Sequence, residues 1–424
     1  MAGEAAAGRA QQGVTLGETS YLPWVAGLGV LLPIFFQLSG GIYRNASVQM
    51  DSGGVLATLP LPVSIPICII ALILVATRFR EARPALAMIV GALVASFISL
   101  WLGGDGVTPP QRKLIMAAQV ILPLAGLLLG QLVDDRNKII ARAFLVVLSV
   151  VVPLQLLATW LQGEERLTHY LYVFSIYYHW QYVPVIFVCA FAYALTSLWD
   201  EYRRWLCVLT IPMFVYVTRS FSFLTIFPFA ALMIAFAACR LWQYRSNVKL
   251  LVASLLVVVA AIGGGAYFAR SGGQSDSGLF MGKFAELSEG RLPGNIQERF
   301  NDWKFFGKGI VESRKTFLVG HPQPMPREIR TSPHNWYLDV AYTFGVIALL
   351  PLFVLAGHTA RQCWSQRKSL PAQTWWLLAI VFFLVVIDSN FKVTLRQPYP
   401  GIFAFFMWGL LLSRLRPTAA RQGA

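Results

Sequence analysis

Long blocks of apolar residues, separated by short polar connections, run through most of the chain. A helix needs roughly 20 such residues to cross the hydrocarbon core of a bilayer, so we expect each block to be a membrane span. The twelve blocks cover residues 22–42, 55–77, 84–103, 114–133, 142–161, 184–199, 205–218, 222–239, 248–268, 335–357, 374–390 and 399–413. The block 205–218 is short for a full crossing and contains Pro212, so a broken or tilted helix is the alternative there. The pattern predicts an all-α, polytopic membrane protein.

The polar segments divide this architecture further. Residues 1–21 form a polar tail, 22–268 hold the first nine spans, 269–334 form one large loop, 335–413 hold the last three spans, and 414–424 form a second tail. Within the loop, FAELSEGRLPGNIQERFNDWKFFGKGI predicts one or two short helices broken at Pro293-Gly294. A loop of this length usually carries a site or acts as a lid.

The composition supports a membrane location. Hydrophobic residues make up 56% of the chain and charged residues 13%, with a mean hydropathy of +0.59. Soluble proteins carry about a quarter charged residues. The net charge of +15 would suit nucleic acid, but its distribution indicates membrane topology instead, so we expect no nucleic-acid partner.

Lys and Arg residues are unevenly divided between the two sets of connections. One set, which includes both tails, carries 18 of them, whereas the short connections of the opposite set carry 7. Because connections rich in Lys and Arg stay in the cytoplasm, we expect both termini to be cytoplasmic. The large loop then lies on the outer side; it holds ten more Lys and Arg, but long loops are exempt from this rule.

The outer segment 162–184, QGEERLTHYLYVFSIYYHWQYVP, is dense in Tyr, Phe and Trp. One interpretation is a belt of aromatic residues at the membrane interface. The other is a platform for a lipid carrier or for sugars, since aromatic faces suit both.

Three ionisable residues lie near the outer ends of spans, where charged groups are costly and point to function. Arg219, in YVTRSFSFL, is either an arginine that extends to the membrane surface or part of an anion site. His334, in TSPHNWYL, is either an interfacial or capping histidine or a group that transfers protons near neutral pH. Asp388, in VVIDSNF, is either a solvated helix-end carboxylate or a partner that orients His334 or a substrate hydroxyl.

These residue types together favour one reaction. Arginine binds phosphate through a bidentate fork, so two arginines could hold a pyrophosphate as it leaves. A histidine could deprotonate the attacking hydroxyl. The five cysteines form no Cys/His metal pattern, and the chain has no Asp-x-Asp motif for a metal-bound nucleotide sugar. We therefore expect glycosyl transfer from a lipid pyrophosphate on the non-cytoplasmic face.

The same segments resemble the motifs of bacterial O-antigen ligases, in the O-antigen ligase/polymerase superfamily. TSPHNWYLDVAYTFGVIALL is similar to the family's histidine motif at the start of a membrane helix, and VTRSFSFL resembles its Arg-Ser turn. ERFNDWKFFGKGI resembles the arginine helix of the large periplasmic loop, and VVIDSN the acidic end of the penultimate span. The resemblance covers most of the chain as architecture and four short motifs as sequence.

The resemblance implies a GT-C-like membrane glycosyltransferase of the bacterial inner membrane with a periplasmic active site. It would transfer a glycan from undecaprenyl pyrophosphate to a sugar hydroxyl of lipid A–core oligosaccharide, completing lipopolysaccharide, with inversion and without a metal or cofactor. His334 would be the catalytic base. Asn335 would add a hydrogen bond or only cap the helix, and Asp388 would support the site.

The resemblance also implies two arginines that bind the donor's pyrophosphate, Arg219 and a loop arginine. We favour Arg299, because Trp303 lies four residues on and on the same helix face. Arg291, in SEGRLPG, is the second candidate.

Three other functions remain open at this point. An O-antigen polymerase shares the donor chemistry and differs in its acceptor, and a protein O-oligosaccharyltransferase belongs to the same superfamily. A lipid-linked oligosaccharide flippase would be a different class, which predicts polar residues at the bilayer midplane and repeat symmetry. The sequence does not specify the glycan, the acceptor sugar or the oligomeric state.

Overall fold

The computed structural model describes residues 21–36, 61–107, 110–133, 135, 137–167, 182–243, 282–283, 285–286, 288–326, 329 and 332–416. These residues are largely helical, and two-residue strands, β1 (Phe35–Phe36) and β2 (Leu61–Pro62), pair antiparallel. Within the described ranges, seven helical segments are long and apolar enough to cross a membrane: Ser64–Gly103, Gln111–Leu132, Ile139–Leu161, Val183–Arg219, Phe223–Arg240, Val346–Gln366 and Ala372–Phe391. The fold is that of a polytopic membrane protein.

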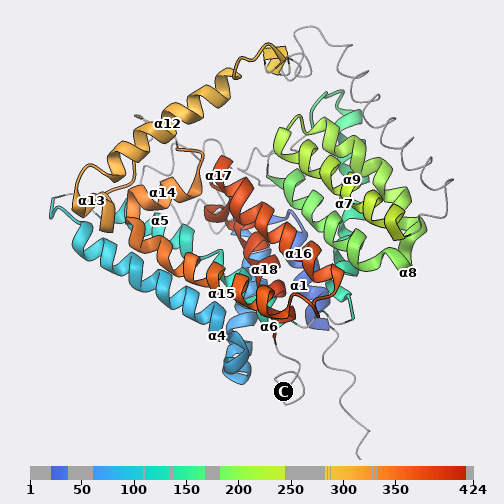
Figure 1. Ribbon diagram of the computed structural model, residues 1–424, viewed down its shortest axis with the longest axis horizontal. Coiled ribbons are helices and arrows are strands. Elements are labelled where there is room, and N and C mark those ends of the chain that lie inside the picture. The colour runs from blue at the N-terminus through green and yellow to red at the C-terminus, as the bar shows by residue number, and fades with distance from the viewer. Residues whose placement is uncertain are drawn as a thin grey trace, which may run out of the picture.

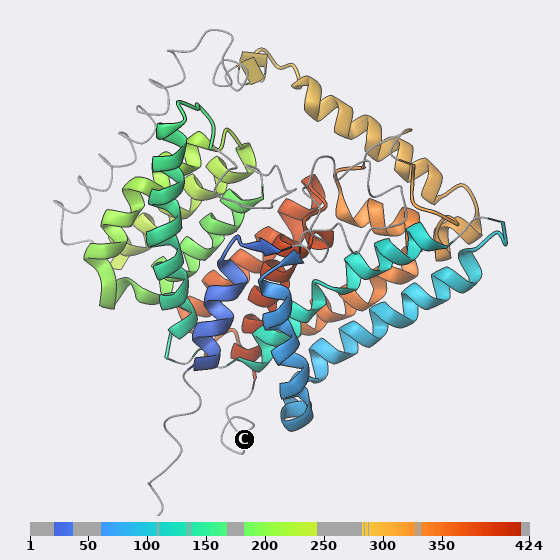
Figure 2. The same cartoon turned by 180° about the vertical axis from the view of Figure 1, so that it is seen from behind.

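Two of these helices each contain two of the spans predicted from the sequence. Helix α4 (Ser64–Gly103) has 40 residues and bends at Arg78, and its arms form a V in both views (Figures 1 and 2). Helix α8 (Val183–Arg219) bends at Tyr202. A straight helix of 40 residues would be about 60 Å long, twice the thickness of a hydrocarbon core. The bends therefore divide each of these continuous helices into two arms, of which the first arm of α4, Ser64–Thr77, is shorter than the roughly 20 residues of a full crossing.

The other predicted spans correspond to shorter elements. Their bounds are α1 (Tyr21–Leu31), α5 (Gln111–Ile121) and α6 (Leu124–Leu132) on either side of Pro123, α7 (Ile139–Leu161), α9 (Phe223–Gln243), α16 (Ala372–Phe382), the π-helix η2 (Phe383–Asp388), α17 (Ser389–Phe391), the short 3₁₀ helix η3 (Thr394–Arg396) and α18 (Pro398–Arg414). The predicted span 248–268 lies outside the described residues.

The predicted single helix over 335–357 is wrong. The segment divides at Gly345 into α14 (Trp336–Phe344), the 3₁₀ helix η1 (Val346–Leu349) and α15 (Leu350–Gln366). Gly345 has a left-handed φ of 75°, and a Cβ at this position would overlap the backbone of Leu318. The apolar pattern continues across the break because α14 is buried in protein. The membrane-length helix therefore begins about a dozen residues after His334.

Helices α6 and α18 cross at the centre of the molecule, and nearly every residue of both is buried. Gly126 and Gly130 form a Gly-x-x-x-Gly pair on α6, and a Cβ on either would overlap a backbone carbonyl of α18. Gly409 faces α6 in the same way. Such small residues let membrane helices approach closely enough for backbone contact.

We expect Gly130→Ala to destabilise the protein by about 1–3 kcal/mol, because the added methyl group overpacks the α6–α18 contact. Gly357→Ala is the matched control, since nothing lies within 4 Å of the position a Cβ would take there. Thermal unfolding of the two purified variants in detergent measures the effect. Equal unfolding temperatures would show that the close approach of α6 and α18 is not needed for stability.

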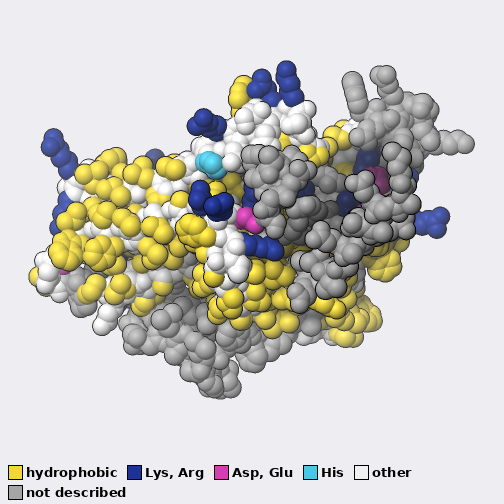
Figure 3. Space-filling view, turned by 90° about the horizontal axis from the view of Figure 1, so that it is seen from below, with side chains coloured by type: hydrophobic (Ala, Val, Ile, Leu, Met, Phe, Trp, Pro, Cys, Tyr) yellow, Lys and Arg dark blue, Asp and Glu magenta, His cyan; other side chains and the backbone are white. Residues whose placement is uncertain are grey.

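Two helices of the predicted loop lie at the upper end of the molecule in Figure 1, opposite the bend of α4. They are α12 (Gly294–Ile310), which begins after Pro293 as predicted, and α13 (Arg314–Val319). The segment after α13 is held by Lys113, a fully buried lysine whose Nζ donates to the carbonyls of Ser99 (3.1 Å) and His321 (2.8 Å). From below, Lys and Arg side chains project beside a mostly hydrophobic flank (Figure 3).

Candidate functional site

His334 occupies a strained position in the loop just before α14. Its backbone has a left-handed φ of 48°, and its N–H donates to Ser332 Oγ at 3.2 Å. Phe221, next to the Arg-Ser pair of YVTRSFSFL, has a similar φ of 46°. Such conformations are uncommon for residues other than glycine and tend to occur at functional sites.

Asn335 caps the N-terminus of α14. Its Oδ1 accepts hydrogen bonds from the backbone N–H groups of Tyr337 (3.0 Å) and Leu338 (3.1 Å). Its Nδ2 donates to Asn390 Oδ1 at 3.0 Å, which ties the start of α14 to the end of α17. Both ends of the amide are engaged within the protein, so Asn335 orients the loop that carries His334.

Helix α12 packs across this loop and brings the charge of Arg299 close enough to influence His334. Trp303 Nε1 donates to the carbonyl of Pro333 at 2.9 Å, and Arg299 Nη1 donates to the carbonyl of Phe391 at 3.0 Å. The rings of Trp303 and Phe391 lie 6.0 Å apart. The four-residue spacing of Arg299 and Trp303 thus lets one face of α12 contact both the His334 loop and the end of α17.

The surroundings of His334 favour its neutral form. Burial lowers the pKa of the imidazole, and the positive charge of Arg299 lowers it further, while Asp302 and Glu298 act in the opposite direction. Burial also lowers the pKa of the Arg299 guanidinium. A neutral imidazole can accept a proton, which a general base requires.

Arg291 lies before the start of α12 and is largely exposed. Its side chain forms an ion pair with Glu289, and its backbone N–H donates to the carbonyl of Glu286 at 2.8 Å. These contacts stay within its own segment, whereas those of Arg299 reach α17.

Arg219 ends α8 and holds the connection that follows α7. Its Nη1 donates to the backbone carbonyls of Glu164 (3.3 Å) and Glu165 (2.9 Å), and its own carbonyl accepts from the N–H of Leu167 (3.3 Å). The guanidinium of Arg166, in the same connection, lies 5.9 Å from the centre of the Phe221 ring.

Lys283 lies within electrostatic range of both Arg166 and Arg299. Burial lowers the pKa of Lys283, and the charges of Arg166 and Arg299 lower it further. We call Arg166, Arg219, Lys283 and Arg299 the cationic cluster. Sequence reasoning assigned no role to Arg166 or Lys283; Lys283 belongs to the basic excess of the large loop, and Arg166 to the seven Lys and Arg of the short connections.

Asp388 is fully buried at the end of the π-helix, so it is not the solvated carboxylate that one interpretation expected. Its carboxylate forms an ion pair with Lys392 Nζ at 3.3 Å and accepts a hydrogen bond from the Thr394 hydroxyl. In the part of the chain that the structure describes, Asp388 binds these two residues and not His334. Asp388 therefore stabilises the turn whose Phe391 carbonyl binds Arg299.

The π-helix η2 shapes this turn. Wider π turns leave backbone carbonyls out of the regular ladder and often occur at functional sites. Here the carbonyl of Val385 accepts from the Tyr337 hydroxyl at 2.7 Å, and that of Leu384 accepts from Ser389 Oγ at 2.8 Å. The apolar sequence of 383–388 does not indicate the change from α-helix to π-helix.

A second ion pair, Arg396 with Asp339, joins η3 to α14 and is largely buried. Lys392 and Arg396 are two of the seven Lys and Arg in the short connections, and both form ion pairs within the protein. Most of the aromatic segment 162–184 lies outside the described residues; Tyr182 belongs to it and lies against Lys392, with Nζ 5.1 Å from the ring centre.

No family model and no curated protein matches this chain. In the part of the chain that the structure describes, no group of three His, Cys, Asp or Glu side chains is placed to hold a metal ion. What the fold and the site define is a class: a multi-pass membrane protein with a histidine, several cations and a buried carboxylate gathered at one end.

Proposed function

We propose that this protein is an O-antigen ligase, a metal-independent, inverting glycosyltransferase that moves a glycan from undecaprenyl pyrophosphate to a sugar hydroxyl of lipid A–core oligosaccharide. The observation that supports the proposal is the packing of α12 on the His334 loop, through Trp303 and Pro333, which brings the positive charge of Arg299 near the imidazole. The cationic cluster extends the positive charge toward Arg219. A polyanionic donor headgroup and a proton acceptor are what this transfer requires.

The proposed reaction assigns a separate task to each group. Arg299 and Arg219 bind the pyrophosphate and stabilise the negative charge that develops on it. His334 takes the proton of the acceptor hydroxyl while its oxygen forms a bond to the anomeric carbon. The bond from that carbon to the phosphate oxygen breaks on the opposite face, and the electron pair leaves with undecaprenyl pyrophosphate. Asp388 and Asn335 act as positioning residues through the α17 turn and the loop.

The proposal places the cationic cluster on the periplasmic face of the bacterial inner membrane and both termini in the cytoplasm. This orientation is inferred from the uneven distribution of Lys and Arg between the two sets of connections. Ser365 and Ser288 are exposed residues near opposite ends of this arrangement.

We expect an introduced cysteine at Ser288 to react with a membrane-impermeant maleimide in intact spheroplasts, and one at Ser365 to react only after permeabilisation. The background would lack Cys207 and Cys239, which are exposed. The readout is mass-tagging of the protein on a gel. Labelling of Ser365→Cys in sealed cells would contradict the proposed topology.

The function is tested in a bacterium that lacks its own O-antigen ligase but still makes the lipid-linked glycan. Expression of this protein should restore glycan-bearing lipopolysaccharide, seen as a ladder after separation of lipid A-containing material. If the donor and acceptor match and the protein is present in the membrane, absence of the ladder would contradict the proposal. A matched pair can be taken from the organism that supplies the gene.

A further inference from the structure

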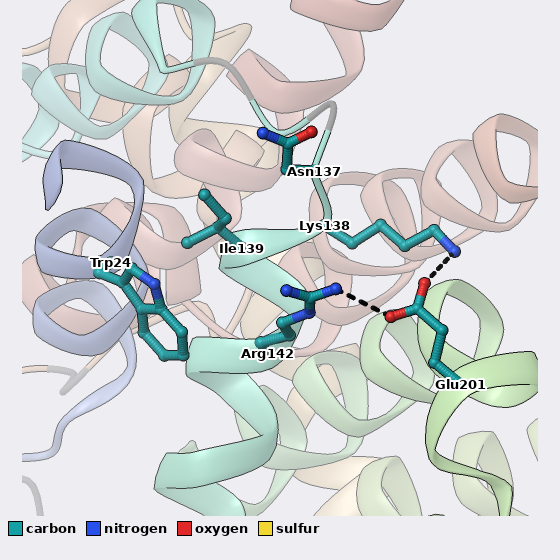
Figure 4. A pocket seen from close by; sticks show the side chains of 6 residues that line it. All are labelled: Trp24, Asn137, Lys138, Ile139, Arg142 and Glu201. Carbon is teal, nitrogen blue, oxygen red and sulfur yellow. Dashed lines mark hydrogen bonds and ion pairs between the residues drawn. The ribbon is translucent and has the colours of Figure 1, made fainter. Parts of the chain in front are cut away.

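An open pocket of about 520 Å³, called the cavity below, lies on the surface of the molecule and is shown with its lining side chains in Figure 4. It lies where the start of α1, the start of α7 and the bend of α8 meet, and its lining residues are Trp24, Asn137, Lys138, Ile139, Arg142 and Glu201. The bend is 17 residues before Arg219, which is roughly 25 Å along the second arm of α8. The cavity is therefore separate from the proposed active site.

The charges in this cavity favour an anion. Glu201 is already bound on both oxygens: Oε1 accepts from Lys138 Nζ at 2.8 Å and Oε2 from Arg142 Nη2 at 2.9 Å. The described lining thus contains two cations and one carboxylate, and each oxygen of that carboxylate already accepts a hydrogen bond from one of the cations. Lys138 and Arg142 keep further N–H donors, since an ammonium has three and a guanidinium five.

One nitrogen of Arg142 is closed off from solvent and is therefore not among the donors that a ligand in the cavity can reach. Arg142 Nε is inaccessible to solvent and makes no hydrogen bond in the described part of the chain. Buried donors normally have an acceptor. The other end of the Arg142 guanidinium is held by Glu201, and Tyr202 lies beside it with its ring centre 5.9 Å away. These contacts hold the Arg142 side chain, and because that side chain is 38% exposed, its remaining accessible N–H groups can reach a ligand.

The backbone at this site is also strained. Lys138 has a left-handed φ of 57°, the only lysine among the three non-glycine residues with positive φ in the described ranges. The other two, Phe221 and His334, belong to the proposed active site. Strained conformations persist where surrounding structure enforces them, as ligand clamps do. The strain directs the Lys138 side chain toward Glu201 at the rim of the cavity.

We propose that this cavity binds the phosphate of an anionic phospholipid headgroup, with Lys138 and Arg142 as its donors. Arginine and lysine are the usual phosphate ligands, and basic pockets between membrane helices bind acidic lipid headgroups. Trp24 has the amphipathic side chain that occurs at the level of headgroups. The volume is within the range of small-molecule sites. A bound lipid joins α1, α7 and α8 at the membrane surface.

The test measures lipid retention by native mass spectrometry of the purified full-length protein in detergent. The probes are phosphatidylglycerol, phosphatidylcholine with the same acyl chains, and inorganic phosphate alone. Three variants are compared with wild type: Arg142→Gln, Glu201→Gln and, as the control, Arg80→Gln, which loses one exposed positive charge outside the cavity lining.

We expect wild type and Arg80→Gln to retain phosphatidylglycerol at least tenfold better than phosphatidylcholine. Arg142→Gln should lose most of this preference. Glu201→Gln should increase phosphatidylglycerol binding several-fold, because it releases two cations from a competing carboxylate. A residue with only a structural role would not give opposite signs in the two cavity variants.

Two results would overturn the proposal. The first is phosphatidylglycerol binding that is unchanged in both cavity variants, provided that each elutes as a monodisperse peak with wild-type unfolding temperature. The second is inorganic phosphate that binds as tightly as phosphatidylglycerol. This result would identify a soluble phosphate as the ligand and exclude a phospholipid.

Discussion

Replacement of His334 by asparagine is expected to lower the rate of glycan transfer by about 10²–10⁴-fold, the usual contribution of a positioned general base. Asparagine tolerates the left-handed backbone that His334 adopts, so the loop should keep its conformation. The amide cannot take up the proton of the acceptor hydroxyl. Donor binding should remain, because the arginines are unchanged. Both quantities are measured on purified protein, with a lipid-linked glycan for binding and lipid A–core as acceptor for transfer.

His358→Asn is the matched control for this experiment. His358 is exposed on α15, and the proposed mechanism gives it no role. Its substitution should leave transfer within about twofold of wild type, on the scale of ordinary surface changes. A His334→Asn enzyme that keeps most of its turnover, or whose only defect is weaker donor binding, would contradict the role of His334 as base.

The pH dependence gives the same assignment a second test. The active form is the neutral imidazole, so the rate should rise with pH through the pKa of His334 and level off above it. Because burial and Arg299 lower this pKa from its ordinary value, the rise should be centred below about 6.5. Asp302→Asn removes a charge that raises the pKa, so it should move the midpoint to lower pH, whereas Arg299→Gln should move it to higher pH. Midpoints that do not respond to either change would exclude His334 as the titrating group.

Replacement of Arg299 by alanine should reduce transfer by about 10²–10³-fold, comparable to the loss of one donor that stabilises charge in a transition state. Two effects combine in this residue. The guanidinium is a proposed ligand of the leaving pyrophosphate, and its hydrogen bond to the Phe391 carbonyl holds α12 against α17. Arg299→Lys should also be impaired, because the bidentate fork is lost while the charge remains.

Arg291→Ala separates the two loop arginines. Its side chain is 73% exposed and contacts only its own segment, so we expect nearly normal transfer. Steady-state rates over a range of donor concentrations compare the variants. If Arg291→Ala loses activity and Arg299→Ala does not, the pyrophosphate is bound by the other arginine and the proposed geometry at α12 is incorrect.

The length of the apolar blocks was sufficient to predict the helical, polytopic class, because such blocks have few stable conformations other than membrane helices. The Pro293-Gly294 pair predicted the break after which α12 starts. The clustering of Arg299 with His334 had a local signal in the Arg299–Trp303 spacing, which the structure uses to dock α12.

Other features depend on contacts between distant segments. The break at Gly345 exists because the chain passes close to the backbone of Leu318. An apolar sequence pattern does not indicate a contact with a distant segment. The buried Asp388–Lys392 pair looks in sequence like two charges at a helix end. The cavity near α1 requires three segments to meet: the starts of α1 and α7 and the bend of α8.

The most direct measurement of the central proposal combines purified protein, a chemically defined undecaprenyl-pyrophosphate glycan and lipid A–core in liposomes containing EDTA. Mass spectrometry of the lipids should find the glycan joined to lipid A–core, with undecaprenyl pyrophosphate as the other product, and neither product with His334→Asn. A glycan that stays on its carrier, is only lengthened there, or moves to lipid A–core equally well in the His334→Asn variant would contradict the account.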